Sequence, residues 1–214
     1  MRTPTVAWWF TPSPTEEELL EVLEEARTWG FLGPGPVAQH LIHSRAFLPL
    51  LPESAGTHLD LGSGGGVPGL VLAAAAPETR WILLDSQQRR TAFLSEAVAR
   101  LGLGNRVEVR CQRAEDAGRG DLRGTLHAVV ARGFSGPATT AECAAPLLAL
   151  QGVLVIAEPP GAPERWSAPE LAELGLEPDE VRTAPIALRR FVQRKHCPDR
   201  FPRRNGLPRK RPLF

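Results

Sequence analysis

The chain has no long apolar run and few cysteines among its 214 residues. Its longest stretch of small apolar residues, 70–77, falls far short of the ~18 residues that a membrane-spanning helix needs. Cys111, Cys143 and Cys197 stand far apart without a CxxC pair, so the sequence indicates neither a zinc site nor a disulfide framework. Consecutive glutamates at 16–18 precede any apolar periodicity, which argues against a secretory signal peptide. We therefore expect a cytoplasmic protein with no membrane segment and no metal ion.

Acidic residues are nearly missing from the C-terminal end. Residues 189–214 hold ten of the 25 lysines and arginines and a single acid, Asp199. The remaining 188 residues carry 15 basic and 23 acidic side chains, a net charge of −8. A basic segment on an acidic body is typical of proteins with a polyanionic partner.

The order of apolar patterns predicts three parts: a helical cap of residues 1–52, a central domain of residues 53–197 and a basic tail of residues 198–214. In the cap, Thr15 and Glu18 form a capping box before an apolar stripe that Gly30 ends, and a second helix is expected over 37–50. Short strands and helices then alternate, which predicts an α/β fold with a doubly wound, mostly parallel sheet. The strands are expected at 57–61, 81–84, 107–111, 127–131, 152–157, around Val181 and at 187–193, and the helices at 67–76, 88–101, 137–150 and 169–174.

A glycine-rich loop, Asp60-Leu61-Gly62-Ser63-Gly64-Gly65-Gly66, follows the first predicted strand. Glycine lets backbone N–H groups approach a ligand where a side chain would block them. Residues 64–69 match the dinucleotide pattern G-x-G-x-x-G, but that match is weak and Pro68 removes an N–H that a pyrophosphate would use. A purely structural turn is a second alternative.

S-adenosylmethionine is the third and favoured ligand of this loop. The loop supplies the acid-x-Gly-x-Gly-x-Gly pattern of such sites in full, beginning at Asp60. Asp85 stands 25 residues later at the end of the second predicted strand, where an acid bonds the ribose hydroxyls. Ala114 and Glu115 follow the third strand, where such sites flank the adenine. The sequence therefore predicts a three-point cofactor site.

Longer segments resemble one family. The runs HLDLGSGGGVPGLVLA, LLDSQQRRTAFLSEAVARLGL, VVARGF and CPDRFPRRNGLPRKRPLF look like the ribosomal RNA small subunit methyltransferase G family, also called GidB, over about residues 34–214. The resemblance implies a class I, Rossmann-like methyltransferase that methylates a guanine N7 in 16S ribosomal RNA as part of rRNA processing. With the loop, it gives a cofactor set of Asp60, Gly62, Ser63, Gly64, Val67, Asp85, Ser86, Ala114, Glu115 and Arg132.

The same resemblance implies which residues act on the RNA that accepts the methyl group. Arg132 and Arg189 are the catalytic candidates, facing the RNA or the reacting groups. The basic tail would grip the RNA backbone, and the expected partner is 16S ribosomal RNA or a small-subunit assembly, bound by a monomer. The RNA-binding candidates are Arg200, Arg203, Arg204, Arg209, Lys210 and Arg211.

The chain departs from the family pattern in its N-terminal part. An Asn-Leu-Thr element is missing, and His43-Ser44 stands where an Asp precedes the serine. A small-molecule methyltransferase of the same ancestry and a non-catalytic RNA-binding protein are therefore alternatives. His40 and His43 lie three residues apart without a third ligand, so we expect packing or surface roles for them. The aromatic run of residues 8–10 is expected to pack onto the domain.

Overall fold

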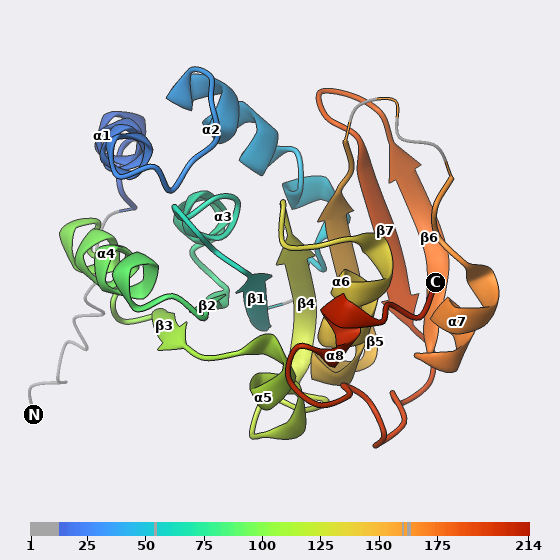
Figure 1. The fold of residues 1–214 in the computed structure, drawn as a ribbon. Coiled ribbons are helices and arrows are strands. Elements are labelled where there is room, and N and C mark those ends of the chain that lie inside the picture. The colour runs from blue at the N-terminus through green and yellow to red at the C-terminus, as the bar shows by residue number, and fades with distance from the viewer. Residues whose placement is uncertain (1–12, 54, 160, 162–163) are drawn as a thin grey trace, which may run out of the picture.

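The computed structural model describes residues 13–53, 55–159, 161 and 164–214. Seven strands form one sheet in the order β3-β2-β1-β4-β5-β7-β6 (Figure 1). β1 to β5 run parallel, and β7 is antiparallel to both of its neighbours. This confirms the predicted doubly wound, mostly parallel sheet. The strands are β1 (Thr57–Leu61), β2 (Arg80–Asp85), β3 (Val107–Cys111), β4 (Leu126–Ala131), β5 (Leu148–Ala157), β6 (Leu176–Arg182) and β7 (Leu188–Gln193).

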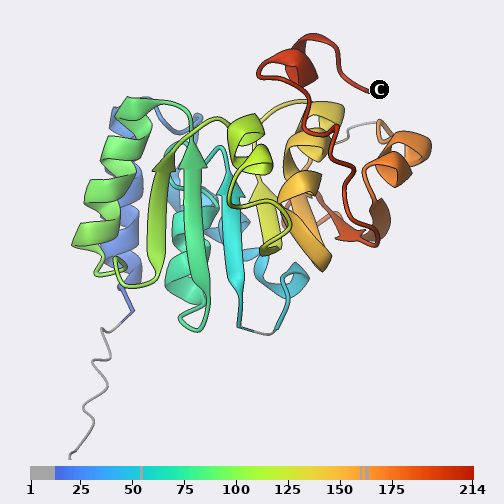
Figure 2. The same ribbon diagram turned by 90° about the horizontal axis from the view of Figure 1, so that it is seen from below.

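Helices cover both faces of the sheet (Figure 2). Side chains alternate along each strand, so Leu83 joins the core on one face while its neighbours Ile82 and Leu84 join the core on the other. The first face is covered by α1 (Glu16–Thr28), α2 (Val37–Arg45), α3 (Gly69–Ala75) and α4 (Gln88–Arg100). The second is covered by α5 (Ala114–Arg119), α6 (Pro137–Ala144) and α7 (Ala168–Glu173), with α8 (Leu207–Lys210) near the chain end.

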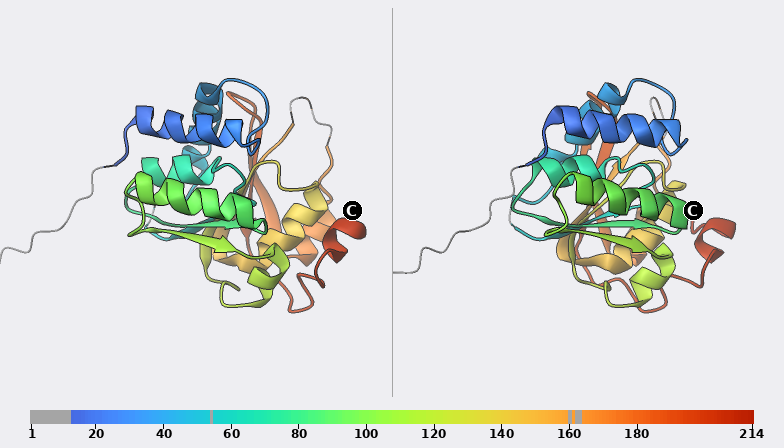
Figure 3. Two further views of the ribbon diagram at one scale, coloured as in Figure 1. Left: turned by 60° about the vertical axis from the view of Figure 1, so that its left-hand side comes forward. Right: turned by 90° about the vertical axis from the view of Figure 1, so that its left-hand side faces the viewer.

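The N-terminal helices belong to the same core as the sheet. The predicted capping box is present: the Thr15 side chain accepts from the Glu18 backbone, and the Glu18 carboxylate accepts from the Thr15 N–H. Figure 3 shows α1 lying beside α4, and Arg100 of α4 pairs with Glu25 of α1. Leu23 of α1 is fully buried in the cluster that also holds α3 and α4.

Several element boundaries differ from the predicted ones. α2 ends at Arg45 and is followed by a 3-10 turn at Leu48–Leu50. α6 ends at Ala144 because Pro146 cannot donate a helical hydrogen bond, and β5 begins at Leu148 within the predicted helix. α3 begins at Gly69, since the chain up to Gly66 holds left-handed φ angles. The aromatic run of residues 8–10 lies outside the described residues.

Candidate active site

The glycine loop turns sharply between β1 and α3. Gly62, Gly64 and Gly66 have φ angles of +78°, +54° and +92°, a region that favours glycine. The N–H groups of Gly62 and Ser63 both donate to the Leu84 carbonyl of β2, at 2.8 and 3.0 Å. The loop is therefore fixed across the carboxyl ends of two neighbouring strands, where open α/β sheets bind ligands.

Asp60 lies beneath this loop and is fully buried. One oxygen, Oδ2, accepts from the N–H of Gly69 at 2.9 Å, at the start of α3. The other, Oδ1, is buried without a partner among the described residues. Burial raises the pKa of Asp60 to about 7. Asp60 is not among the residues that line the cavities above it, so it supports the loop from below.

A cavity of about 370 Å³, here named the β1–β3 cavity, opens at the carboxyl ends of β1 and β2, beside the start of α5. The Asp85 carboxylate lines it and is held from two sides, since Oδ2 accepts from the Gly64 N–H at 3.0 Å and Oδ1 from the Gln87 N–H at 2.9 Å. Five predicted cofactor residues line this cavity: Gly62, Asp85, Ser86, Ala114 and Glu115.

A second cavity of about 340 Å³, the loop cavity, lies between the glycine loop and residues 31–34 of the cap. The predicted residues Ser63, Gly64, Val67 and Arg132 line it. Gly62, Arg90 and Gly133 line both cavities, so the two adjoin. The predicted cofactor residues are thus brought to one place, with Asp60 below.

Arg132 follows β4 and contacts the cap. Its Nη2 donates to Nδ1 of His40 in α2 at 2.8 Å, while Nη1 is buried without a partner among the described residues. Because His40 accepts at Nδ1, its proton sits on Nε2, which lies 3.4 Å from the Gly33 carbonyl. Burial and the charge of Arg132 lower the pKa of His40, which favours this neutral form. Sequence reasoning missed His40 as a site residue, because its partner lies 92 residues away.

Arg189 lies elsewhere. It sits on β7 opposite Ile156 of β5, and its guanidinium donates to Glu164 at 2.9 Å. Arg132 lines the loop cavity, whereas Arg189 lines neither the loop cavity nor the β1–β3 cavity. The structure therefore does not bring the two catalytic candidates to one of these cavities.

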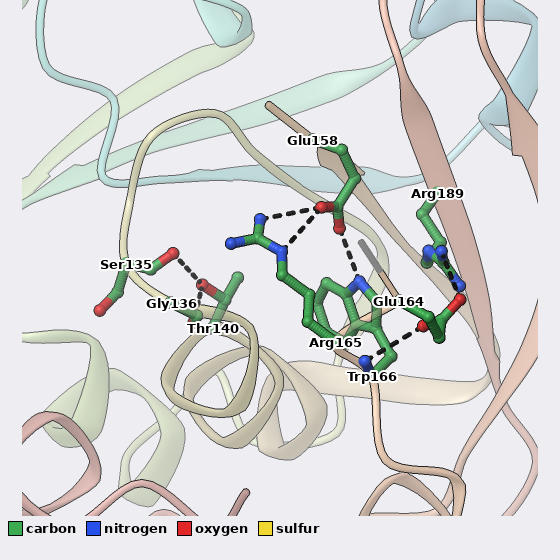
Figure 4. A network of polar contacts seen from close by, with 8 residues as sticks. All are labelled: Ser135, Gly136, Thr140, Glu158, Glu164, Arg165, Trp166 and Arg189. Carbon is green, nitrogen blue, oxygen red and sulfur yellow. Dashed lines mark hydrogen bonds and ion pairs between the residues drawn. The ribbon is translucent and has the colours of Figure 1, made fainter. Parts of the chain in front are cut away.

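A third cavity of about 770 Å³, the β4–β5 cavity, opens at the carboxyl ends of β4 and β5. Arg132 lines both this cavity and the loop cavity, and Ser135 lines both this cavity and the β1–β3 cavity. Gly133 lines all three cavities. Its wall carries a polar network around Glu158 and Trp166 (Figure 4). The three cavities meet at the segment that follows β4.

The C-terminal tail is packed against the domain. Phe201 is buried, and Arg203 pairs with Glu142, which has no exposed surface. The Gly206 N–H donates to Oε1 of Glu115 at 2.8 Å, and both Gly206 and Arg209 line the β1–β3 cavity. Among the RNA-binding candidates, Arg200 pairs with Glu173. The exposed ones without an ion pair to any described residue are Arg204, Arg209, Lys210 and Arg211.

The adjoining cavities fit S-adenosylmethionine. Asp85 is a fixed carboxylate that suits ribose hydroxyls, and Nη1 of Arg132, a buried donor without a partner among the described residues beside the loop cavity, suits the carboxylate of the methionine end. Within the described residues, no group of three potential metal ligands occurs, and no helix there is long and apolar enough to cross a membrane.

Comparisons with known proteins identify the family. A family described as rRNA small subunit methyltransferase G matches residues 35–160. A relative of that name from Fervidobacterium nodosum is 35% identical over 185 residues, covering 82% of this chain and 86% of the relative. One from Thermotoga is 37% identical over 178 residues, covering 78% and 76%.

Solved structures show the fold. An S-adenosylmethionine-dependent methyltransferase from Aquifex aeolicus superposes with a TM-score of 0.56 at 16% identity, covering 79% of this chain and 97% of that one. A cofactor-bound protein from MTB gives 0.61 at 17% identity, covering 85% and 91%. The chain therefore belongs to the ribosomal RNA small subunit methyltransferase G family, as an S-adenosylmethionine-dependent methyltransferase.

Proposed function

We propose that this methyltransferase acts on N7 of a guanine in 16S ribosomal RNA, free or in a small-subunit assembly, as a cytoplasmic monomer. The observation that carries the proposal is the meeting of the three cavities at residues 132–135, since the β4–β5 cavity would then be free to take the acceptor guanine beside the cofactor. The relatives are named for small subunit ribosomal RNA, which supports this RNA as the methyl acceptor. Exposed basic side chains lie on the tail beside the site.

The chemistry suits a site without a general base. S-adenosylmethionine, when bound, supplies an electrophilic methyl group. Guanine N7 carries an in-plane lone pair and no proton, so the protein needs only to bring N7 and the methyl carbon into line. Proximity and orientation can contribute roughly 7–11 kcal/mol in well-aligned systems. Arg132 is the proposed positioning group, because its buried Nη1 lies free to bond guanine O6, a phosphate or the cofactor carboxylate.

The three parts of the chain have separate proposed roles. Residues 53–197 bind the cofactor with the set Asp60, Gly62, Ser63, Gly64, Val67, Asp85, Ser86, Ala114, Glu115 and Arg132. Residues 1–52 supply His40 behind Arg132. Residues 198–214 bind RNA through Arg200, Arg204, Arg209, Lys210 and Arg211, while Arg203 also anchors the tail to Glu142.

The test is methyl transfer from radiolabelled cofactor to small-subunit RNA from a strain that lacks the enzyme. We expect label in the RNA, recovered as 7-methylguanosine. No incorporation into any RNA preparation, while calorimetry shows bound cofactor, would overturn the proposal. A small-molecule methyltransferase would retain its activity when the exposed tail charges are neutralised. Substitution is preferable to truncation, since removing the tail would also remove Phe201 and Arg203 from their buried contacts.

A further inference from the structure

Glu158 is the only carboxylate among the described residues that line the β4–β5 cavity. It directly follows β5, and its N–H donates to the Ala187 carbonyl at 2.9 Å, which fixes its backbone at the strand end. Its side chain is 9% exposed. A carboxylate withdrawn from water this far requires bonded partners, and the side chain is well placed to discriminate among ligands.

Two side chains hold this carboxylate in a fixed orientation (Figure 4). Nε1 of Trp166 donates to Oε1 at 2.6 Å, and Nε and Nη2 of Arg165 donate to Oε2 at 3.1 and 2.8 Å. The Trp166 ring is itself packed against Phe191, with ring centroids 4.7 Å apart. A carboxylate offers about four acceptor positions. The three hydrogen bonds from Trp166 and Arg165 occupy three of these acceptor positions, so one position on Oε1 remains for a ligand.

The charged side chains of this cavity fall into hydrogen-bond donors and hydrogen-bond acceptors. Arg132 and Arg165 can only donate hydrogen bonds, and Glu158 can only accept them. Guanine has the complementary division. N7 and O6, on one edge, are acceptors, whereas N1–H and the N2 amino group, on the other, are donors. A guanine whose N7 faces the methyl group therefore needs an acceptor away from the methyl donor.

We propose that Glu158 accepts a hydrogen bond from the N2 amino group of the acceptor guanine and so makes the enzyme specific for guanine. This inference rests on the proposed function. Adenine has no amino group at this position, so adenine would leave the buried carboxylate without that bond. Ile156, Trp166 and Ile186 contribute apolar surface to the same cavity, which suits the flat face of a purine.

The test compares small-subunit RNA that carries guanosine at the mapped methylation position with ligated RNA that carries inosine there. Inosine lacks only the N2 amino group. We expect the wild-type kcat/KM to fall about tenfold or more with inosine, the effect of losing one hydrogen bond to a charged group. For Glu158→Ala we expect equal kcat/KM on both RNAs. Glu158→Gln keeps a neutral acceptor, so we expect it to retain part of the discrimination, reduced at least about threefold.

The matched control is Glu180→Gln, which changes an exposed carboxylate of β6 that pairs with Arg182. It should discriminate as the wild type does. Cofactor binding by calorimetry shows whether each variant is folded, and Glu158→Gln decides the matter if Glu158→Ala is not. The inference is overturned if the wild type methylates both RNAs equally, or if the Glu158 variants keep the wild-type ratio. Neither result affects the proposed function, which fails only if no RNA is methylated at all.

Discussion

The site lies along the carboxyl ends of the strands, and the two halves of this edge of the sheet are built differently. In the cofactor half, around β1 and β2, backbone N–H groups and buried carboxylates that are close in sequence shape the site, as in the contact between Gly69 and Asp60. In the half that we propose for the acceptor, around β4, β5 and the tail, several contacts join side chains from distant segments, as in Arg132 with His40. Changes in the first half should therefore alter folding and cofactor binding, whereas changes in the second should alter methyl transfer and RNA binding.

We expect Gly69→Ala to have the largest effect. The added Cβ would lie 2.4 Å from Cβ of Asp60 and 2.7 Å from Cδ2 of Leu83, so the start of α3 must move. Overpacking of this kind costs about 1–3 kcal/mol or more, which corresponds to a fall in Tm of about 5 °C. Thermal denaturation and calorimetry should show this fall together with weaker cofactor binding.

Gly104→Ala is the matched control, because no atom lies within 4 Å of the Cβ it would add. It should keep the wild-type Tm. If Gly69→Ala behaves as Gly104→Ala does, the cofactor half does not depend on this close backbone approach.

His40→Leu tests the acceptor half through its contact with the cap. The substitution removes the acceptor of the Arg132 guanidinium, and losing such a bond costs about 1.5–3 kcal/mol, or roughly a tenfold to hundredfold fall in kcat. His40→Asn restores an acceptor near the position of Nδ1 and should recover part of the rate. His127→Asn, at the opposite end of β4, should leave the rate unchanged. Equal losses in both His40 variants would show that His40 acts by packing alone.

The exposed tail charges should affect RNA binding without affecting the cofactor. Arg204→Gln, Lys210→Gln and Arg211→Gln together remove three exposed cations. At about 0.7 released counterions per contact, the slope of log Kd against log salt should change by about 2. Filter binding at several salt concentrations measures this, and calorimetry should give the wild-type cofactor affinity. A slope equal to that of the wild type would place the RNA on another surface.

His58 should give the smallest effect, and only at acidic pH. It lies on β1, buried against Trp81, and burial lowers its pKa to about 4. The unfolded chain binds this proton below about pH 6.5 and the folded one does not until about pH 4, so stability falls as the pH falls between these values. At about pH 6 this loss of stability is roughly 0.8 kcal/mol.

Urea unfolding of His58→Leu at several pH values measures this contribution. The variant should lose that part of the pH dependence and keep the wild-type methylation rate at neutral pH. A pH dependence identical to that of the wild type would mean that folding does not lower the pKa of His58.

The sequence predicts the cofactor half more completely than the other half, and the reason is physical. The loop from Asp60 to Gly66 is continuous, and its geometry follows from glycine's access to positive φ angles, so a local pattern predicts it. The alternation of apolar residues likewise predicted the sheet. The contact of Glu115 with Gly206 spans 91 residues and depends on how the tail folds back, which no local pattern encodes.

Glu158 differs in part. Its partners Arg165 and Trp166 stand only seven and eight residues away, but no local pattern marks it as a site residue, because the other walls of its cavity come from β4, α6 and the segment before β7. α6 ends earlier than predicted for a simpler reason, which is Pro146. The periodicity of apolar residues alone does not show where a proline ends a helix. Sites formed by backbone conformation can thus be predicted from sequence more fully than sites formed by side chains from several segments.

The most direct measurement of the central claim is nucleoside mass spectrometry of small-subunit RNA from a strain lacking the enzyme, after incubation with the purified protein and S-adenosylmethionine. We expect 7-methylguanosine at a single position, and we expect Arg132→Ala to reduce it sharply, together with weaker cofactor binding by calorimetry because Arg132 belongs to the cofactor set. Unmethylated RNA from the wild-type reaction, with cofactor bound, would contradict the claim.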